Sequence, residues 1–156
     1  MMNGSILRTS LATVAAIVYA FLGVSGHAAA SDSPRWLTVA EVRGALLGRP
    51  AAGIYPDGTP WAEIITANGR ADYSERGERR GGSWSFNLEG ELCFRYDDGR
   101  GGGCFRYVQI SSNCYEHFYQ VFGPKTDSTG PDDRFLTNGR LWRTDEPQTC
   151  DEKPAV

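Results

Sequence analysis

The chain has 156 residues, a formal charge of −3 at pH 7, four cysteines and two histidines. This length provides for one domain with a single modest core. The net charge is negative, and the sequence lacks the stripe of basic side chains that neutralises the phosphates of a nucleic acid. A nucleic acid is therefore not expected as the main partner.

Residues 1–30 have the composition of a cleaved signal peptide. Arg8 precedes an apolar run over residues 11–24, and small residues follow at Ala28 and Ala30. A run of this length is shorter than the ~20 residues that span a bilayer. We expect cleavage near Ala30, a periplasmic or secreted location, and no membrane span after cleavage.

The mature chain begins with one predicted helix, over residues 38–47. Thr38 and Glu41 have the spacing of a capping box, Gly48 provides a C-terminal stop, and Pro50 prevents continuation. A helix this short needs a sheet to cover its apolar stripe. That stripe consists of Val39, Val42, Leu46 and Leu47.

From Gly53 onward, polar and apolar residues alternate with period two, which is typical of strands. Strands are predicted over residues 60–67 and 70–74, joined by a two-residue turn at Asn68-Gly69. Residues 75–82 contain three glycines and five charged side chains. We interpret them as a solvated loop or a ragged hairpin end.

Residues 84–108 encode two successive hairpins whose register can be derived from the turns. The second turn, centred on Asp98-Gly99, is formed by a loop of two or four residues. One face of this sheet is then apolar, and a cysteine pair lies on the reverse face. The predicted opposite pairs are Trp84 with Phe94, Phe86 with Leu92, Leu92 with Phe105, Cys93 with Cys104, and Glu91 with Arg106.

The remaining pattern is also β-rich. A strand is predicted over residues 114–122, a loop over 123–133, and a hairpin with an Asn138-Gly139 turn over 135–142. With seven to eight short strands and one N-terminal helix, the fold class is mainly β, a small antiparallel β-barrel or sandwich, with a closed barrel preferred. Residues 31–145 form one domain, and residues 146–156 form a polar tail tethered by Cys150.

All four cysteines lie in the mature chain, which favours disulfides in an exported protein. Three pairings are possible; the hairpin register favours Cys93 with Cys104, which leaves Cys114 with Cys150. A metal site would need closer cysteine spacing or more histidines. We therefore expect no metal and no cofactor.

The sequence contains no recognisable catalytic set. His117 is the only histidine of the mature chain, it lies in an aromatic strand, and no nucleophile elbow accompanies it. The adjacent carboxylates at 97–98 and 132–133 fall in loops, where solvation explains them. We expect a non-enzymatic protein. The rings that could line a pocket are Trp84, Tyr96, Tyr107 and Tyr119.

The chain contains six short motifs: Leu37-Thr38-x-x-Glu41, Asp57-Gly58, Asn68-Gly69-Arg70, Gly82-Ser83-Trp84, Leu92-Cys93-Phe94-x-Tyr96 and Cys104-Phe105. Together they resemble a group of small exported alphaproteobacterial proteins that carry a domain of unknown function. The resemblance implies a periplasmic location and a β-rich domain.

Two functional hypotheses follow from the sequence. The first is a binding module for a small ligand or an envelope component. The alternative is a protein-directed module, such as an inhibitor of a cell-wall hydrolase, that inserts residues 75–82 or 97–103 into the partner's cleft. The partner is thus an unknown small ligand or a periplasmic protein.

Overall fold

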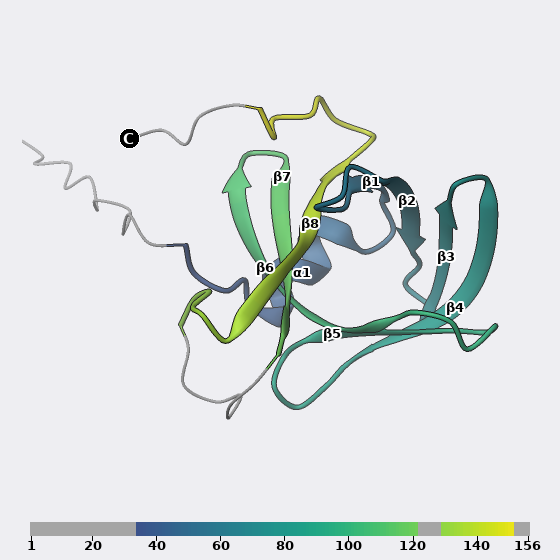
Figure 1. The fold of residues 1–156 in the computed structure, drawn as a ribbon, viewed down its shortest axis with the longest axis horizontal. Helices are drawn as coiled ribbons and strands as arrows, with labels where there is room; N and C mark the ends of the chain where they lie inside the picture. The colour runs from purple at the N-terminus through teal and green to yellow at the C-terminus, as the bar shows by residue number, and fades with distance from the viewer. Residues whose placement is uncertain (1–33, 122–128, 152–156) are drawn as a thin grey trace, which may run out of the picture. The chain divides into compact units, whose positions relative to one another are not determined.

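The computed structural model describes residues 34–121 and 129–151. Within these ranges, eight strands form a closed barrel in sequence order, and one helix accompanies them (Figure 1). The predicted signal peptide, residues 1–30, lies outside the described residues, and so do residues 123–128 of the predicted loop. The mainly β fold is confirmed, and it is a barrel rather than a sandwich.

Every strand pairs antiparallel with its neighbours in sequence, and β8 returns to pair with β1. This closure pairs both edges of the sheet, which would otherwise offer unpaired backbone groups. The elements are α1 Val39–Leu46, β1 Pro50–Ile54, β2 Pro60–Ile65, β3 Arg70–Glu75, β4 Glu78–Phe86, β5 Leu92–Tyr96, β6 Gly103–Ser111, β7 Cys114–Gln120 and β8 Phe135–Arg143.

The helix α1 starts as the sequence predicts. The Thr38 hydroxyl accepts a hydrogen bond from the Glu41 backbone N–H, and the Glu41 carboxylate accepts one from the Thr38 backbone N–H. Val42 and Leu46 are buried in the barrel core. Arg43 lies over the rings of Trp84 and Phe86. These contacts place α1 at the barrel end that carries the β4–β5 turn.

The predicted register of the central hairpins is confirmed for four of its five pairs, and the fifth, Glu91 with Arg106, lies beyond the paired residues of β5 and β6. Trp84 lies opposite Phe94 and Cys93 opposite Cys104. The β5–β6 loop, residues 97–102, is longer than either length predicted for it. Both disulfides are present: Cys93–Cys104, with Cα atoms 3.9 Å apart, and Cys114–Cys150.

Residues 75–82 were predicted as a solvated loop or a ragged hairpin end, and of these two the hairpin end is correct. Arg76 and Gly77 alone connect β3 to β4, with φ angles of 50° and 82°, and Glu75 lies opposite Glu78. A two-residue turn with both φ angles positive matches the twist of the flanking strands. The charges therefore alternate along a strand, and Arg80 is on its inner face, with a side chain only 17 % exposed.

The predicted hairpin over residues 135–142 is wrong, because β8 is one continuous strand. Thr137 lies opposite Phe118 and Gly139 opposite His117, so Asn138 is the extra residue of a β-bulge. Gly139 has a φ of 129°, and a Cβ there would overlap the carbonyl oxygen of Ile54. The Asn-Gly pair serves a bulge here rather than a turn.

Two smaller expectations need adjustment. The turn at Asn68-Gly69 has three residues rather than two, because the Thr66 N–H donates to the Arg70 carbonyl at 2.9 Å and only Gly69 has a positive φ. Strand β1 was not predicted from the sequence; it begins at Pro50, directly after the residues that end the helix.

The C-terminal segment is tethered as predicted. In addition to the Cys114–Cys150 disulfide, the Asn113 side-chain amide donates to the carbonyls of Arg143, Glu146 and Pro147. No helix among the described residues is long and apolar enough to cross a membrane.

Candidate functional site

A cavity of about 280 Å³ lies inside the barrel. It is near the end that carries the β1–β2 turn and the β5–β6 loop, away from α1, because Tyr55, Gly101 and Gly102 contribute to its wall. Its other lining residues are Trp61, Glu63, Tyr73, Phe94, Tyr96, Phe105, Tyr107, His117 and Asn138.

Two glycines make room for the large rings of this cavity. Gly53 lies opposite Trp61, and a Cβ on Gly53 would overlap the indole ring. Gly82 lies opposite Tyr96, and a Cβ there would be 2.8 Å from Tyr96 Cδ1. Small residues opposite large ones are how a small barrel accommodates aromatic side chains.

Glu63 is a carboxyl group inside the barrel. It lies opposite Tyr73 in the β2–β3 pair and is only 9 % exposed. The Tyr96 hydroxyl donates a hydrogen bond of 2.9 Å to Glu63 Oε1. Burial raises the pKa of Glu63 to about 7, although the hydrogen bond from Tyr96 acts in the opposite direction. At neutral pH the carboxyl is therefore divided between its protonated and charged forms.

His117 forms a second polar point in the cavity wall. Its Nε2 lies 2.8 Å from Nδ2 of Asn138, the bulge residue of β8. Burial lowers the pKa of His117 to about 4, so the imidazole is neutral at pH 7. The ring is stacked on Tyr107 and meets Trp61 edge-on. The β-bulge of β8 thus places the Asn138 amide within hydrogen-bonding distance of His117.

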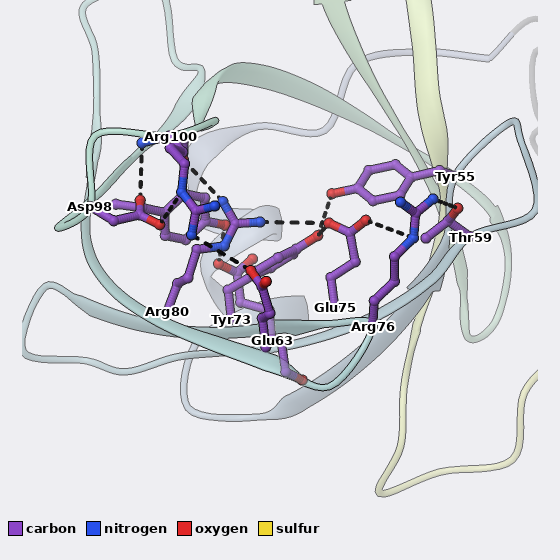
Figure 2. A network of polar contacts seen from close by, with 12 residues as sticks. Tyr55, Thr59, Glu63, Tyr73, Glu75, Arg76, Arg80, Asp98 and Arg100 are labelled. Carbon is purple, nitrogen blue, oxygen red and sulfur yellow. Dashed lines mark hydrogen bonds and ion pairs between the residues drawn. The ribbon is translucent and has the colours of Figure 1, made fainter.

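A network of polar side chains lies at the mouth of the cavity, where it includes the lining residues Tyr55, Glu63 and Tyr73. Its contacts are drawn in Figure 2. The Tyr73 hydroxyl lies 2.8 Å from the Tyr55 hydroxyl and donates to Glu75 Oε2 at 2.8 Å. Arg80 lies over the rings of Tyr73 and Tyr96, at 4.9 and 5.3 Å from their centroids. Its guanidinium contacts the Glu75 carboxylate at 3.6 Å.

The structure places only two of the four predicted pocket residues at the cavity. Tyr96 and Tyr107 line it. Trp84 lies at the α1 end, where its indole N–H donates to the Thr66 carbonyl at 2.8 Å. Tyr119 lies on β7 and is 37 % exposed, and it is not among the lining residues.

The sequence reading missed several cavity residues, of which Glu63 is the most informative. Trp61, Glu63 and Ile65 alternate along β2 toward the interior. A charged residue at an inward position of a strand is a signal that the sequence contains. Asn138 gave no such signal, because its Asn-Gly pair indicated a turn.

A larger depression of about 620 Å³ lies over strands β1–β4. Most of its side chains alternate away from the barrel interior, among them Ala62, Asp72 and Arg79. We favour the interior cavity as the candidate site, because buried polar groups and aromatic rings converge there.

Comparisons with known proteins do not identify the chain. No protein-family model matches it, and no curated protein is significantly similar to it. Among the described residues, no group of three or more His, Cys, Asp or Glu side chains could hold a metal ion. The function therefore has to be argued from the cavity itself.

Proposed function

We propose that this protein is a non-enzymatic, exported binding module that holds a small ligand inside its barrel. The observation that carries the proposal is the interior cavity, where aromatic rings surround a few polar groups at fixed positions. The Glu63 carboxyl with Tyr96 and the His117–Asn138 pair are those groups. An apolar wall with a few convergent polar groups is typical of small-molecule sites.

Export is supported by the two disulfides and by the N-terminal residues. Disulfides persist in oxidising compartments such as the periplasm. Residues 1–30 have the composition of a signal peptide, and the motifs of the central hairpins resemble exported alphaproteobacterial proteins. A ligand of the cell envelope is consistent with this location.

The cavity offers its own spectroscopic reporter. Of the four tryptophans, only Trp61 lines the cavity. A small-molecule library screened by tryptophan fluorescence should yield ligands that change the emission of Trp61. The Trp61→Phe variant should lose this signal, and the matched Trp142→Phe variant should keep it. The proposal is wrong if no compound changes the Trp61 signal, or if NMR shift changes from every binder lie on the outer face.

One observation favours the alternative of a protein-directed module. The two segments expected to contact a partner, residues 75–82 and 97–103, touch each other, because Arg80 Nη1 donates to the Arg100 carbonyl at 3.1 Å and Arg100 lies 3.6 Å from Glu78. If this surface inhibits a cell-wall hydrolase, the protein should block lysozyme-catalysed lysis of cell walls. Replacing Glu78 and Arg100 with alanine should then remove the inhibition. Undiminished lysis with the unmodified protein in molar excess would exclude lysozyme-type hydrolases as its target.

A further inference from the structure

Resting on the proposed function, we infer that the cavity ligand is a small organic cation with an apolar body, such as an amine or a quaternary ammonium compound. Glu63 supplies the negative charge, and the surrounding tyrosine and tryptophan rings supply the cation-binding wall. The inference depends on the arrangement of the charges and on the aromatic composition of the cavity.

The first observation is that Glu63 has no cationic partner among the described residues. The Tyr96 hydroxyl is its hydrogen-bond partner, at 2.9 Å. Arg80, the nearby arginine of the mouth, pairs with Glu75 instead. A buried carboxylate without a counter-charge costs several kcal/mol, whereas a paired one is stabilised. A bound cation would supply the missing charge.

The second observation is the aromatic wall. Rings with electron-rich faces attract cations, and aromatic cages recognise quaternary ammonium groups. Arg80 shows that the rings of Tyr73 and Tyr96 already accept a cation on one face. The rings that line the cavity are Tyr55, Trp61, Tyr73, Phe94, Tyr96, Phe105 and Tyr107.

The charges on the other strands agree with this choice of ligand. His117, on β7, is kept neutral by burial, which lowers its pKa to about 4, so no imidazolium repels a cation at pH 7. The tyrosines that face the cavity are also neutral, since burial raises the pKa values of Tyr55, Tyr73, Tyr96 and Tyr107. An anionic ligand, in contrast, would have to share the cavity with Glu63.

The affinity for a cation should rise with pH. Glu63 has a pKa of about 7 without ligand, and a bound cation favours its charged form. Binding therefore expels the proton of Glu63. Between pH 6 and pH 8 the affinity should increase about ten-fold, because about nine-tenths of the carboxyl is protonated at the lower pH. Glu75 and Arg80, which also face the mouth, pair with each other.

A matched series of three ligands tests the charge preference. Benzylamine, benzyl alcohol and benzoate share one ring and differ in charge, and choline with its neutral isostere 3,3-dimethyl-1-butanol forms a second pair. Binding is measured by calorimetry and by Trp61 fluorescence at pH 8. The expected result is at least about ten-fold tighter binding of each cation than of its neutral partner, consistent with a desolvated cation–π contact and one ion pair.

Two variants test whether Glu63 is the group that gives the cavity its preference for cations. Glu63→Gln should reduce the cation affinity at least about ten-fold and abolish its rise between pH 6 and pH 8. Glu116→Gln is the matched control, because Glu116 is a carboxylate of β7 that pairs with Arg140 at 2.7 Å, outside the cavity. This control should bind as the unmodified protein does. Near-ultraviolet circular dichroism confirms that both variants keep their packed rings.

The outcomes separate the inference from the proposed function. If benzyl alcohol or benzoate binds as tightly as benzylamine and changes the Trp61 signal, the cavity is a binding site but its ligand is not a cation. If none of the five compounds enters the cavity, the cation inference is overturned, and the broader library decides the proposed function. If Glu63→Gln binds both cations unchanged, Glu63 has no part in recognition and the inference fails.

Discussion

Tyr96 and Glu63 are 33 positions apart in the chain, yet the Tyr96 hydroxyl donates to Glu63 Oε1 at 2.9 Å. Tyr96 lies on β5 and Glu63 on β2, so the phenol reaches over two intervening strands. Gly82 of β4 permits this reach, because it lies opposite Tyr96 and has no side chain in the path of the ring. The position of the buried carboxyl thus depends on a glycine of another strand.

Replacing Tyr96 with phenylalanine should raise the pKa of Glu63 above about 7. The hydroxyl donates to the charged carboxylate and favours it, so its loss leaves burial unopposed. The same change should cost about 1 kcal/mol of unfolding free energy. A carbon-13 NMR titration of the Glu63 carboxyl measures the shift.

Tyr107→Phe is the control for that titration. Tyr107 also lines the cavity, but its hydroxyl forms no hydrogen bond with Glu63. Its replacement should leave the Glu63 titration nearly unchanged. An equal shift in both variants would mean that the cavity responds to the loss of any hydroxyl, and that the Tyr96 bond has no special effect.

Glu63 should make the protein less stable as the pH rises. Its pKa is about 7 in the folded state and 4.5 in the ordinary state, so between these values the folded protein binds the additional proton. The stability that Glu63 contributes is then lost from about pH 4.5 to pH 7, and this contribution levels off above pH 7. The difference between the folded and the ordinary pKa of Glu63 corresponds to about 3 kcal/mol of unfolding free energy. Glu63→Gln should remove this loss, as measured by urea unfolding at several pH values.

His117 should act in the opposite direction. Its pKa falls from 6.5 to about 4 on folding, so the unfolded chain binds the additional proton between these values, and stability rises with pH there. The two contributions should nearly cancel between about pH 4.5 and 6.5 in the unmodified protein. His117→Phe should expose the falling trend due to Glu63, and Glu63→Gln the rising trend due to His117. A flat profile in both variants would contradict the assignment of these two groups.

The sequence predicts the barrel well, because local patterns determine most of it. Turn residues and alternation define the register of the central hairpins, and this register gave the Cys93–Cys104 pair correctly. The same kind of pattern failed at Asn138-Gly139. A bulge and a turn require similar residues, and the choice between them depends on His117 and Ile54, which lie on other strands.

The cavity was harder to predict than the fold. Tyr96 and Tyr107 were found because their rings share the apolar face of one hairpin. Glu63 stands at an inward position of β2, which the sequence pattern shows, but its hydrogen bond with Tyr96 depends on the barrel, which brings side chains of β2 and β5 together. Arg80 was interpreted as a solvated charge, and the Arg76-Gly77 turn instead continues its strand, so that its guanidinium lies over the rings.

The two disulfides should contribute unequally to stability. Cys93–Cys104 closes a separation of 11 residues and Cys114–Cys150 one of 36. In the chain-entropy model these loops correspond to about 3 and about 4 kcal/mol. Replacing Cys114 and Cys150 with alanine should therefore lower the unfolding free energy by about 1 kcal/mol more than replacing Cys93 and Cys104. Equal or reversed losses in denaturant titrations would show that strain or residual structure outweighs loop length.

Gly53→Ala tests how tightly the cavity wall is packed. A Cβ at this position would overlap the Trp61 ring and approach the Arg140 carbonyl oxygen at 2.7 Å, so the indole has to move. Overpacking of this kind costs about 1–3 kcal/mol. Gly44→Ala is the matched control, since nothing lies within 4 Å of its Cβ position and it is an exposed residue of α1. Alanine is the better helix former by about 1 kcal/mol, so this variant should be more stable. If Gly53→Ala is as stable as the unmodified protein and its Trp61 fluorescence is unchanged, then the glycine is not what positions the indole.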